Sequence, residues 1–214
     1  DRSFALFDDV IGDAFVSDVT HTLAFQLQDD FRDQPATANA HIRHLNLLMS
    51  FAIDREYISQ NPFRRIKQLE TDEWRDWTEA EIATFLDKVP EDSLARRIVI
   101  LALTTAQRRS DLARMSVEDI ASNRIRVKQD KTDAVLEIPV HPQLRDELDK
   151  RPPIGAYLLH DAKGDRLRDD FPTKAVKQSC VAVGLPKDLK RHGLRKAACR
   201  RLAEAGCSAH EIQA

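Results

Sequence analysis

The chain has 214 residues, of which 32% are charged and 42% hydrophobic, and its formal net charge at pH 7 is −2. This length accommodates two modest domains that bury their cores without disulfides. No apolar run approaches the roughly 18 residues of a membrane span, so we expect no membrane partner. The cysteines Cys180, Cys199 and Cys207 form no C-x-x-C pair. This spacing argues against a zinc site or a disulfide framework and favours reduced thiols in a cytoplasmic protein.

Charge is distributed unevenly along the chain. Residues 1–60 contain ten acidic and four basic side chains, so the remainder is net basic. The densest basic stretch is Pro186–Arg201, where seven lysines and arginines oppose the single acid Asp188. Such a patch suits the phosphates of a nucleic acid. The alternative is a solvated helix face, which a run of charge alone does not exclude.

The first part of the chain shows helical patterns. Thr20 is a suitable N-cap for a helix that runs to about Phe31. The stretch Ala36–Tyr57 carries apolar residues three and four apart, which predicts a helix with one buried stripe. His41 and His44 lie three apart on this helix, but no third ligand accompanies them, so we interpret both as facing solvent or DNA.

A change in pattern near Thr71 divides the chain into two domains. Residues 71–77 have no clear period and are rich in charge, which is typical of a linker. We therefore predict a helical domain over residues 1–70 and a second, mixed domain over residues 78–214. The pair Thr78 and Glu81 predicts a capping box that opens a helix ending at Lys88.

The second domain mixes helices with a hairpin. An apolar helix is predicted over Leu94–Thr105. Residues 124–129 and 135–140 alternate in polarity like paired strands, joined by a polar turn with Lys131 at its tip. Further helices are predicted over Asp170–Val183 and from His192 to Ala205. The predicted fold class is mainly α with a small antiparallel β-sheet.

Three separated clusters carry the chemistry: Q-R-R-S-D-L at 107–112, Q-D-K-T at 129–132 and R-H-G-L-R-K at 191–196. In order and spacing they resemble the signature of the tyrosine recombinases of the phage integrase family. The T-A-N-A-H-I-R-H-L stretch at 37–45 and the N-P pair at Asn61 are similar to that family's core-binding domain. Residues 203–214 resemble the segment that leads, in the family, to a glycine-histidine pair and the nucleophilic tyrosine. Neither of these elements occurs in this sequence, so we expect a C-terminally incomplete catalytic domain.

The resemblance implies a fold and a function. The fold is a SAM-like helical core-binding domain followed by an α+β catalytic domain. The function is site-specific DNA recombination, integration or excision, in which strands are cut and rejoined through a 3′-phosphotyrosyl intermediate. No metal or other cofactor is implied. The implied partners are a double-stranded DNA attachment site, three further copies in a homo-tetramer on DNA when the protein is full length, and accessory DNA-bending proteins. A cytoplasmic, bacterial or phage-encoded protein is expected.

The resemblance also assigns catalytic roles. Arg108 and Arg195 match the two arginines that neutralise the phosphate, a role for which the planar, permanently charged guanidinium is well suited. His192 would assist proton movement. Lys131 would protonate the departing 5′ oxygen, although lysines are also common at hairpin tips for solubility. Ala106 stands where the family usually has glycine.

Other residues are expected to support this site or to contact DNA. Asp111 lies three residues after Arg108, and its carboxylate either orients that arginine or forms only a surface ion pair. Thr132 follows Lys131 in the family's register and is a second supporting residue. The predicted DNA-binding residues are basic side chains near these motifs and in the first domain: Arg43, Arg64, Arg65, Arg109, Lys190, Arg191 and Lys196.

The nucleophile is missing from the predicted site. The sequence has two tyrosines, Tyr57 and Tyr157, and their apolar neighbours suggest packing roles for both. The chain as given is therefore expected not to cleave DNA. Two alternatives remain open: a type IB topoisomerase, which shares this chemistry, and a non-catalytic DNA-binding regulator derived from a recombinase.

Overall fold

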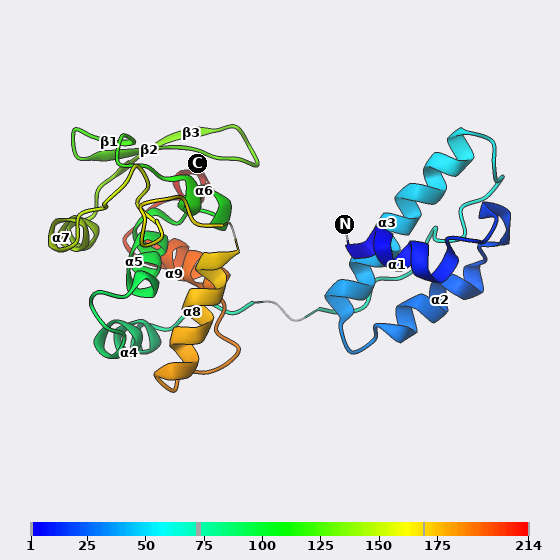
Figure 1. The fold of residues 1–214 in the computed structure, drawn as a ribbon, viewed down its shortest axis with the longest axis horizontal. Coiled ribbons are helices and arrows are strands. Elements are labelled where there is room, and N and C mark those ends of the chain that lie inside the picture. Colours follow the sequence, from blue (N-terminus) through cyan, green and yellow to red (C-terminus); the bar gives the residue numbers. More distant parts are fainter. Residues whose placement is uncertain (1, 72–73, 169, 214) are drawn as a thin grey trace. The chain divides into compact units, whose positions relative to one another are not determined.

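The computed structural model describes residues 2–71, 74–168 and 170–213. The chain divides into two compact units, Asp1–Glu73 and Trp74–Ala214. Figure 1 shows the helices of the first unit in blue and cyan, and the mixed second unit from green to red. No helix in the described residues is long and apolar enough to cross a membrane.

The first unit is helical. It contains α1 (Arg2–Ile11), a short 3₁₀ helix (Val16–Asp18), α2 (His21–Asp30) and α3 (Pro35–Asp54). Thr20 caps α2 as predicted, because its side chain accepts a hydrogen bond from the backbone N–H of Leu23. Helix α3 ends three residues before the predicted Tyr57, since the backbone at Glu56 turns to a φ of 61°.

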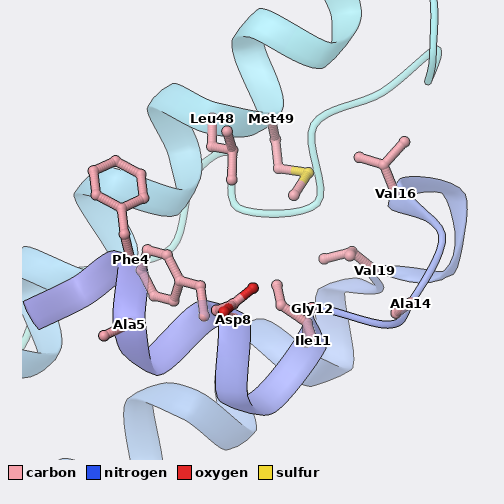
Figure 2. A pocket seen from close by; sticks show the side chains of 11 residues that line it. Phe4, Ala5, Asp8, Ile11, Gly12, Ala14, Val16, Val19, Leu48 and Met49 are labelled. Carbon is pink, nitrogen blue, oxygen red and sulfur yellow. The ribbon is translucent and has the colours of Figure 1, made fainter. Parts of the chain in front are cut away.

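Apolar side chains of α1, α2 and α3 form the core of this unit, together with Phe63 from the segment that follows. Between α1 and α3 the packing leaves a hollow of 640 Å³ lined mainly by apolar side chains. Figure 2 shows Leu48 and Met49 of α3 on one side of it and Ile11 of α1 on another.

The two histidines of α3 belong to this packing. The His41 ring is buried and makes edge contacts with Phe7 and Phe31, at centroid distances of 5.9 and 4.8 Å. Burial lowers its pKa. His44 is stacked with Phe4, at 6.3 Å. The prediction that His41 faces solvent or DNA is therefore wrong, because its helical position falls within the buried stripe.

The second unit surrounds helix α5 (Leu94–Thr105), whose central residues are almost inaccessible. Helices α7 (Pro142–Lys150), α8 (Phe171–Ala182) and α9 (Arg191–Glu204) pack against α5. Helix α4 (Glu79–Lys88) precedes α5, and α6 (Arg109–Arg114) and α10 (Ala209–Gln213) complete the helical part of the unit. The helix bounds predicted for α4 and α5 are confirmed, and Thr78 and Glu81 form the predicted capping box.

The sheet of this unit is antiparallel with the order β1-β2-β3. Its strands are β1 (Ile120–Ala121), β2 (Arg124–Lys128) and β3 (Val135–Pro139). The predicted hairpin is confirmed, with Arg124 opposite Pro139 and Lys128 opposite Val135. Alternate residues of β2 are buried, as the alternating sequence requires. In Figure 1 the sheet covers one end of the unit, above α5 and α6.

The stretch predicted as a linker, residues 71–77, is divided in the structure. Residues 72–73 lie outside the described residues. Residues 74–77 belong to the second unit, because the Trp77 side chain is fully buried in its core and packs edge-on against Phe85 at 5.5 Å. A tryptophan near a domain boundary is thus a structural anchor for the second unit.

Candidate functional site

Arg108 lies at the turn between α5 and α6. Helix α5 ends at Ala106, whose backbone is left-handed with a φ of 54°. This turn makes Arg108 the N-cap residue of α6. The Arg108 Nη1 donates a hydrogen bond to Oε1 of Gln129, at 3.0 Å. The guanidinium is therefore held by the end of the hairpin strand β2.

A relay of glutamines fixes this contact. Gln129 is buried, and its Oε1 also accepts a hydrogen bond from the Thr132 hydroxyl at 2.7 Å. Its Nε2 donates to Oε1 of Gln107 at 3.1 Å, and Gln107 in turn donates to the Thr105 carbonyl at 3.0 Å. Sequence reasoning assigned no role to the two glutamines. Both glutamines stand at the first position of a motif, Gln107 in 107–112 and Gln129 in 129–132, and this position could have indicated a role.

Asp111 contacts the hairpin rather than Arg108. Its carboxylate is buried, and Oδ1 accepts a hydrogen bond from the Asp130 backbone N–H at 3.0 Å, whereas Oδ2 has no partner in the described residues. The interpretation that Asp111 orients Arg108 directly, or forms a surface ion pair with it, is therefore wrong. Gln129 orients Arg108, and Asp111 holds the turn that carries Lys131.

The start of α9 is anchored to the segment before α4. The Trp77 indole N–H donates to the Lys190 carbonyl at 3.0 Å. A Cβ at Gly193 would lie 2.4 Å from the Arg75 carbonyl oxygen, so this close approach requires glycine. The packing fixes the first turn of α9, on which His192 and Arg195 are one turn apart and share a face.

The positively charged side chains near the start of α9 lower one another's pKa. Burial, and then repulsion by Arg108, lower the pKa of Arg195, and its Nη1 has no hydrogen-bond partner in the described residues. Burial is also the main cause that lowers the pKa of His192. The positive charges of Arg191, Arg195, Lys196 and Arg108 lower it further. The imidazole is thus neutral at pH 7 and able to exchange a proton. The structure brings Arg108, His192 and Arg195 into one cationic cluster, which we call the arginine cluster.

Aromatic contact supports the histidine of this cluster. The ring of Trp74 lies edge-on to that of His192, with a centroid distance of 5.2 Å. Trp74 is otherwise 54% exposed. The contact ties His192 to the residues that enter the second unit.

The other predicted site residues differ in their surroundings. Lys131 is exposed in the hairpin turn, and its ammonium makes no hydrogen bond or ion pair within the described part of the chain. Lys190 is the N-cap residue of α9, and Lys196 is half-buried on that helix. Arg109 is exposed on α6, whereas Arg191 is buried. In the first unit the predicted DNA-binding residues are all exposed: Arg43, Arg64 and Arg65.

The tyrosines lie elsewhere. Tyr57 is 63% exposed in the first unit, so the interpretation that it packs in a core is wrong: the chain leaves α3 before this residue. Tyr157 is half-buried in the loop after α7, where its backbone pairs with Ser116. Within the described residues of the second unit, Tyr157 makes no contact with the arginine cluster.

The arrangement defines a class of site. Two guanidinium groups converge beside a neutral imidazole, and a lysine projects from an adjacent fixed hairpin. This combination suits a phosphodiester group, because arginines neutralise its oxygens while the other side chains move protons. Residues 76–214 match the model of the phage integrase family. The chain belongs to this family.

Similar proteins span both units of the chain. The integrase of Escherichia phage P2 is 27% identical over 198 residues, which cover 89% of this chain and 55% of that protein. This chain therefore spans about half the length of the curated relative it matches.

Solved structures show the same fold. A lambda integrase fragment (residues 75–356), described as a dimer bound to a COC′ core site, has a TM-score of 0.85 at 21% identity, over 99% of this chain and 83% of that one. A lambda integrase tetramer bound to a Holliday junction has a TM-score of 0.79 at 22% sequence identity, and the match covers 92% of this chain and 63% of that one. The Tn1549 transposon integrase in complex with circular intermediate DNA has a TM-score of 0.70 at 19% sequence identity, and the match covers 92% of this chain and 76% of that one. The predicted fold class is confirmed.

Proposed function

We propose that this chain is the core-binding and phosphate-binding part of a site-specific DNA recombinase. The observation that carries the proposal is the arginine cluster, in which the charges of Arg108 and Arg195 repel each other and a buried nitrogen of Arg195 has no partner in the described residues. A scissile phosphate would provide the missing acceptor. The first unit would be the core-binding domain and the second the catalytic domain.

The reaction follows from the roles of these groups. Arg108 and Arg195 stabilise the negative charge that develops on the non-bridging oxygens as a nucleophile attacks phosphorus. Their positions are fixed in advance by the glutamine relay and by the anchored α9, so little reorganisation is needed. His192 moves a proton and donates a hydrogen bond to the phosphate. Lys131 projects from a turn held by Asp111 and Thr132, and protonates the departing 5′ oxygen.

The nucleophile would be a tyrosine other than Tyr57 and Tyr157. Attack by a tyrosine hydroxyl breaks the bond to the 5′ oxygen and forms a 3′-phosphotyrosyl ester, which conserves the bond for rejoining. Tyr157, in the same unit as the cluster, makes no contact with it in the described residues. We therefore expect the chain to bind DNA without cleaving it. A longer protein that supplies the tyrosine would catalyse integration or excision.

The proposed partners follow from the similar proteins. Lambda integrase is described as a dimer on a core site and as a tetramer on a Holliday junction, so a homo-tetramer on a double-stranded attachment site is proposed here. The basic residues of both units would contact the backbone: Arg43, Arg64, Arg65, Arg109, Lys190, Arg191 and Lys196. Accessory DNA-bending proteins are proposed as further partners. The phage relative and the free thiols support action in the cytoplasm of a bacterial host.

Because Tyr157 makes no contact with the cluster in the described residues, a second candidate is a DNA-binding regulator without catalysis. A type IB topoisomerase would share the chemistry, but the likeness of both units to integrases favours the recombinase.

Covalent trapping separates these candidates. This chain, and a version carrying what the natural reading frame encodes after Ala214, would be incubated with nicked attachment-site DNA and resolved on a denaturing gel. A recombinase gives an adduct with the extended chain only. Arg108→Ala or Arg195→Ala in that chain should slow adduct formation by about 100-fold or more, as loss of a transition-state donor does.

The matched control is Arg145→Ala, which removes a half-buried arginine of α7 whose hydrogen bond in the described residues is to Asn123, and it should leave the rate unchanged. DNA binding without an adduct from either chain would support the regulator and contradict the recombinase.

A further inference from the structure

Arg191 is a buried arginine without a partner. It begins α9, yet only 7% of the residue is exposed. Its Nε and Nη1 are inaccessible, and the described residues give none of its nitrogens a hydrogen bond or ion pair. Buried arginines are normally paired, because an unsatisfied charged donor in the interior is costly.

The surroundings of Arg191 disfavour its positive charge. Burial, followed by repulsion from Arg109 and Arg195, lowers its pKa to about 10, so the side chain remains charged at pH 7. The N-terminal end of a helix also carries partial positive charge, and Arg191 lies in the first turn of α9. An anion bound at Arg191 would offset these unfavourable effects.

Arg109 is a second arginine whose charge acts on Arg191, and it lies at the surface. It is exposed at the start of α6, directly after Arg108, and has no recorded partner in the described residues. It lines an open hollow with Arg166, Leu167, Arg168 and Asp170. Asp170 is engaged with Lys174 at 2.6 Å, and the Arg166 Nε is bonded to the Ala113 carbonyl at 3.2 Å. The hollow therefore presents Arg109, the arginine whose charge repels that of the buried Arg191.

We propose that Arg191 and Arg109 form a second phosphate subsite, which binds a phosphodiester next to the scissile one on the same DNA strand. The inference rests on the proposed function, since Arg108 and Arg195 take the scissile phosphate. Arg108 and Arg109, which are adjacent at the start of α6, would belong to different subsites. So would Arg191 and Arg195, which are four residues apart on α9. Side chains four apart on a helix are roughly 5–6 Å apart at Cβ, which suits neighbouring phosphates of one strand.

The subsite predicts opposite changes in binding and stability. Replacing Arg191 by methionine removes an uncompensated buried charge from the free protein and keeps an apolar side chain of similar length. The thermal midpoint of the second unit should then rise, by about 2–4 °C. Binding to DNA should weaken by about tenfold, because a charge-assisted contact to phosphate is lost. A purely structural arginine would not show this combination.

The experiment measures the affinity of the whole chain for a duplex of about 30 base pairs by fluorescence anisotropy at several salt concentrations, and the thermal midpoint of each variant. Loss of one phosphate contact should make the slope of log affinity against log salt less negative by about 0.9. Arg191→Lys, which keeps the charge, should restore part of the affinity. Arg145→Met is the matched control and should change neither the affinity nor the slope.

Comparison with Arg108→Met separates this inference from the function on which it rests. If Arg108→Met weakens binding but Arg191→Met leaves affinity and slope unchanged, the second subsite is wrong and the recombinase proposal stands. If neither substitution changes DNA binding, the proposed function itself is contradicted. A lower thermal midpoint for Arg191→Met would also overturn the subsite, because Arg191 would then stabilise the free protein.

Discussion

Two buried arginines of the second unit have opposite surroundings. Arg97 on α5 is 3% exposed and donates to Glu147 at 3.1 Å, to the Leu158 carbonyl at 3.4 Å and to the Arg151 carbonyl. Arg191 on α9 is similarly buried but has repelling neighbours and no acceptor in the described residues. The difference separates an arginine that completes the fold from one for which we propose a partner outside the chain.

The comparison extends to the hairpin. Arg108 has one acceptor, Gln129, which positions the guanidinium without neutralising it. A neutral amide leaves the positive charge available to an anion, whereas a carboxylate such as Glu147 cancels it. The chemical nature of the partner thus distinguishes the arginines of the proposed phosphate site from those of the core.

The largest effect is expected when the core arginine Arg97 is replaced. Arg97→Met leaves Glu147 buried with Arg151 as its remaining ion-pair partner. The free energy of unfolding of the second unit should fall by about 3 kcal/mol, as is usual when one member of a buried pair is removed. Chemical denaturation would measure it. DNA affinity per folded molecule should be unchanged, and a loss of affinity at full folding would break the distinction between the two arginines.

The next effect concerns the arginine cluster. Arg195→Met should weaken DNA binding by about tenfold, or about 1.4 kcal/mol, without lowering the thermal midpoint, because the lost guanidinium nitrogen Nη1 had no partner. Anisotropy and thermal denaturation of the same sample would test both statements. Arg145→Met again provides the control. If Arg195→Met lowered stability as much as affinity, Arg195 would be a structural arginine like Arg97, and the account would be contradicted.

A paired surface arginine provides the pH test. Arg75 donates to both Glu81 oxygens, at 2.9 and 2.7 Å, and lowers the pKa of Glu81 to about 2. A lowered carboxyl pKa stabilises the folded state above the ordinary value of 4.5, and this stability is lost as pH falls from 4.5 towards 2. Solvent screening reduces the contribution to about 1 kcal/mol.

Glu81→Gln keeps the capping-box geometry but removes the charge. Urea denaturation should find the variant less stable than the natural chain near neutral pH and equal to it near pH 2. Asp188→Asn is the matched control, because Asp188 also binds Arg75 but is 60% exposed and should contribute less. A constant difference between Glu81→Gln and the natural chain across this pH range would refute the ion-pair account.

The smallest effect is expected at the turn that positions Arg108. Ala106 has a φ of 54°, where an alanine Cβ is strained and a glycine is not. Ala106→Gly should stabilise the second unit by about 0.5 kcal/mol, since relief of strain exceeds the added flexibility of the unfolded chain. Denaturation would detect it. Destabilisation would mean that the alanine methyl group packs favourably in this turn.

Much of the fold could be predicted from local patterns. The bounds of α4 and α5 follow from a capping box and a strongly apolar run, and the hairpin follows from two alternating segments. Helix α6 was not predicted, because six residues are too few to display a helical period. Helix α10, with five residues, was missed for the same reason. Helix α1 was also missed, although it is as long as α2 and α4.

The candidate site was only partly predictable. The motifs identified Arg108, His192 and Arg195, whose mutual proximity depends on packing between α5, α6 and α9. The link from Gln107 to Gln129 spans 22 positions in sequence, so no local pattern shows it. The burial of Arg191 was also invisible, because a basic run looks like a solvated face until the helix is packed.

Nuclear magnetic resonance of the arginine side chains would test the central claim most directly. The Nε–H signals of Arg108, Arg191 and Arg195 would be followed in the whole chain as a DNA duplex is added, with Arg97 as an internal reference. The account predicts that the signals of the three site arginines shift and that the Arg97 signal does not. Unchanged signals from those three arginines, while other signals of the chain report bound DNA, would contradict it.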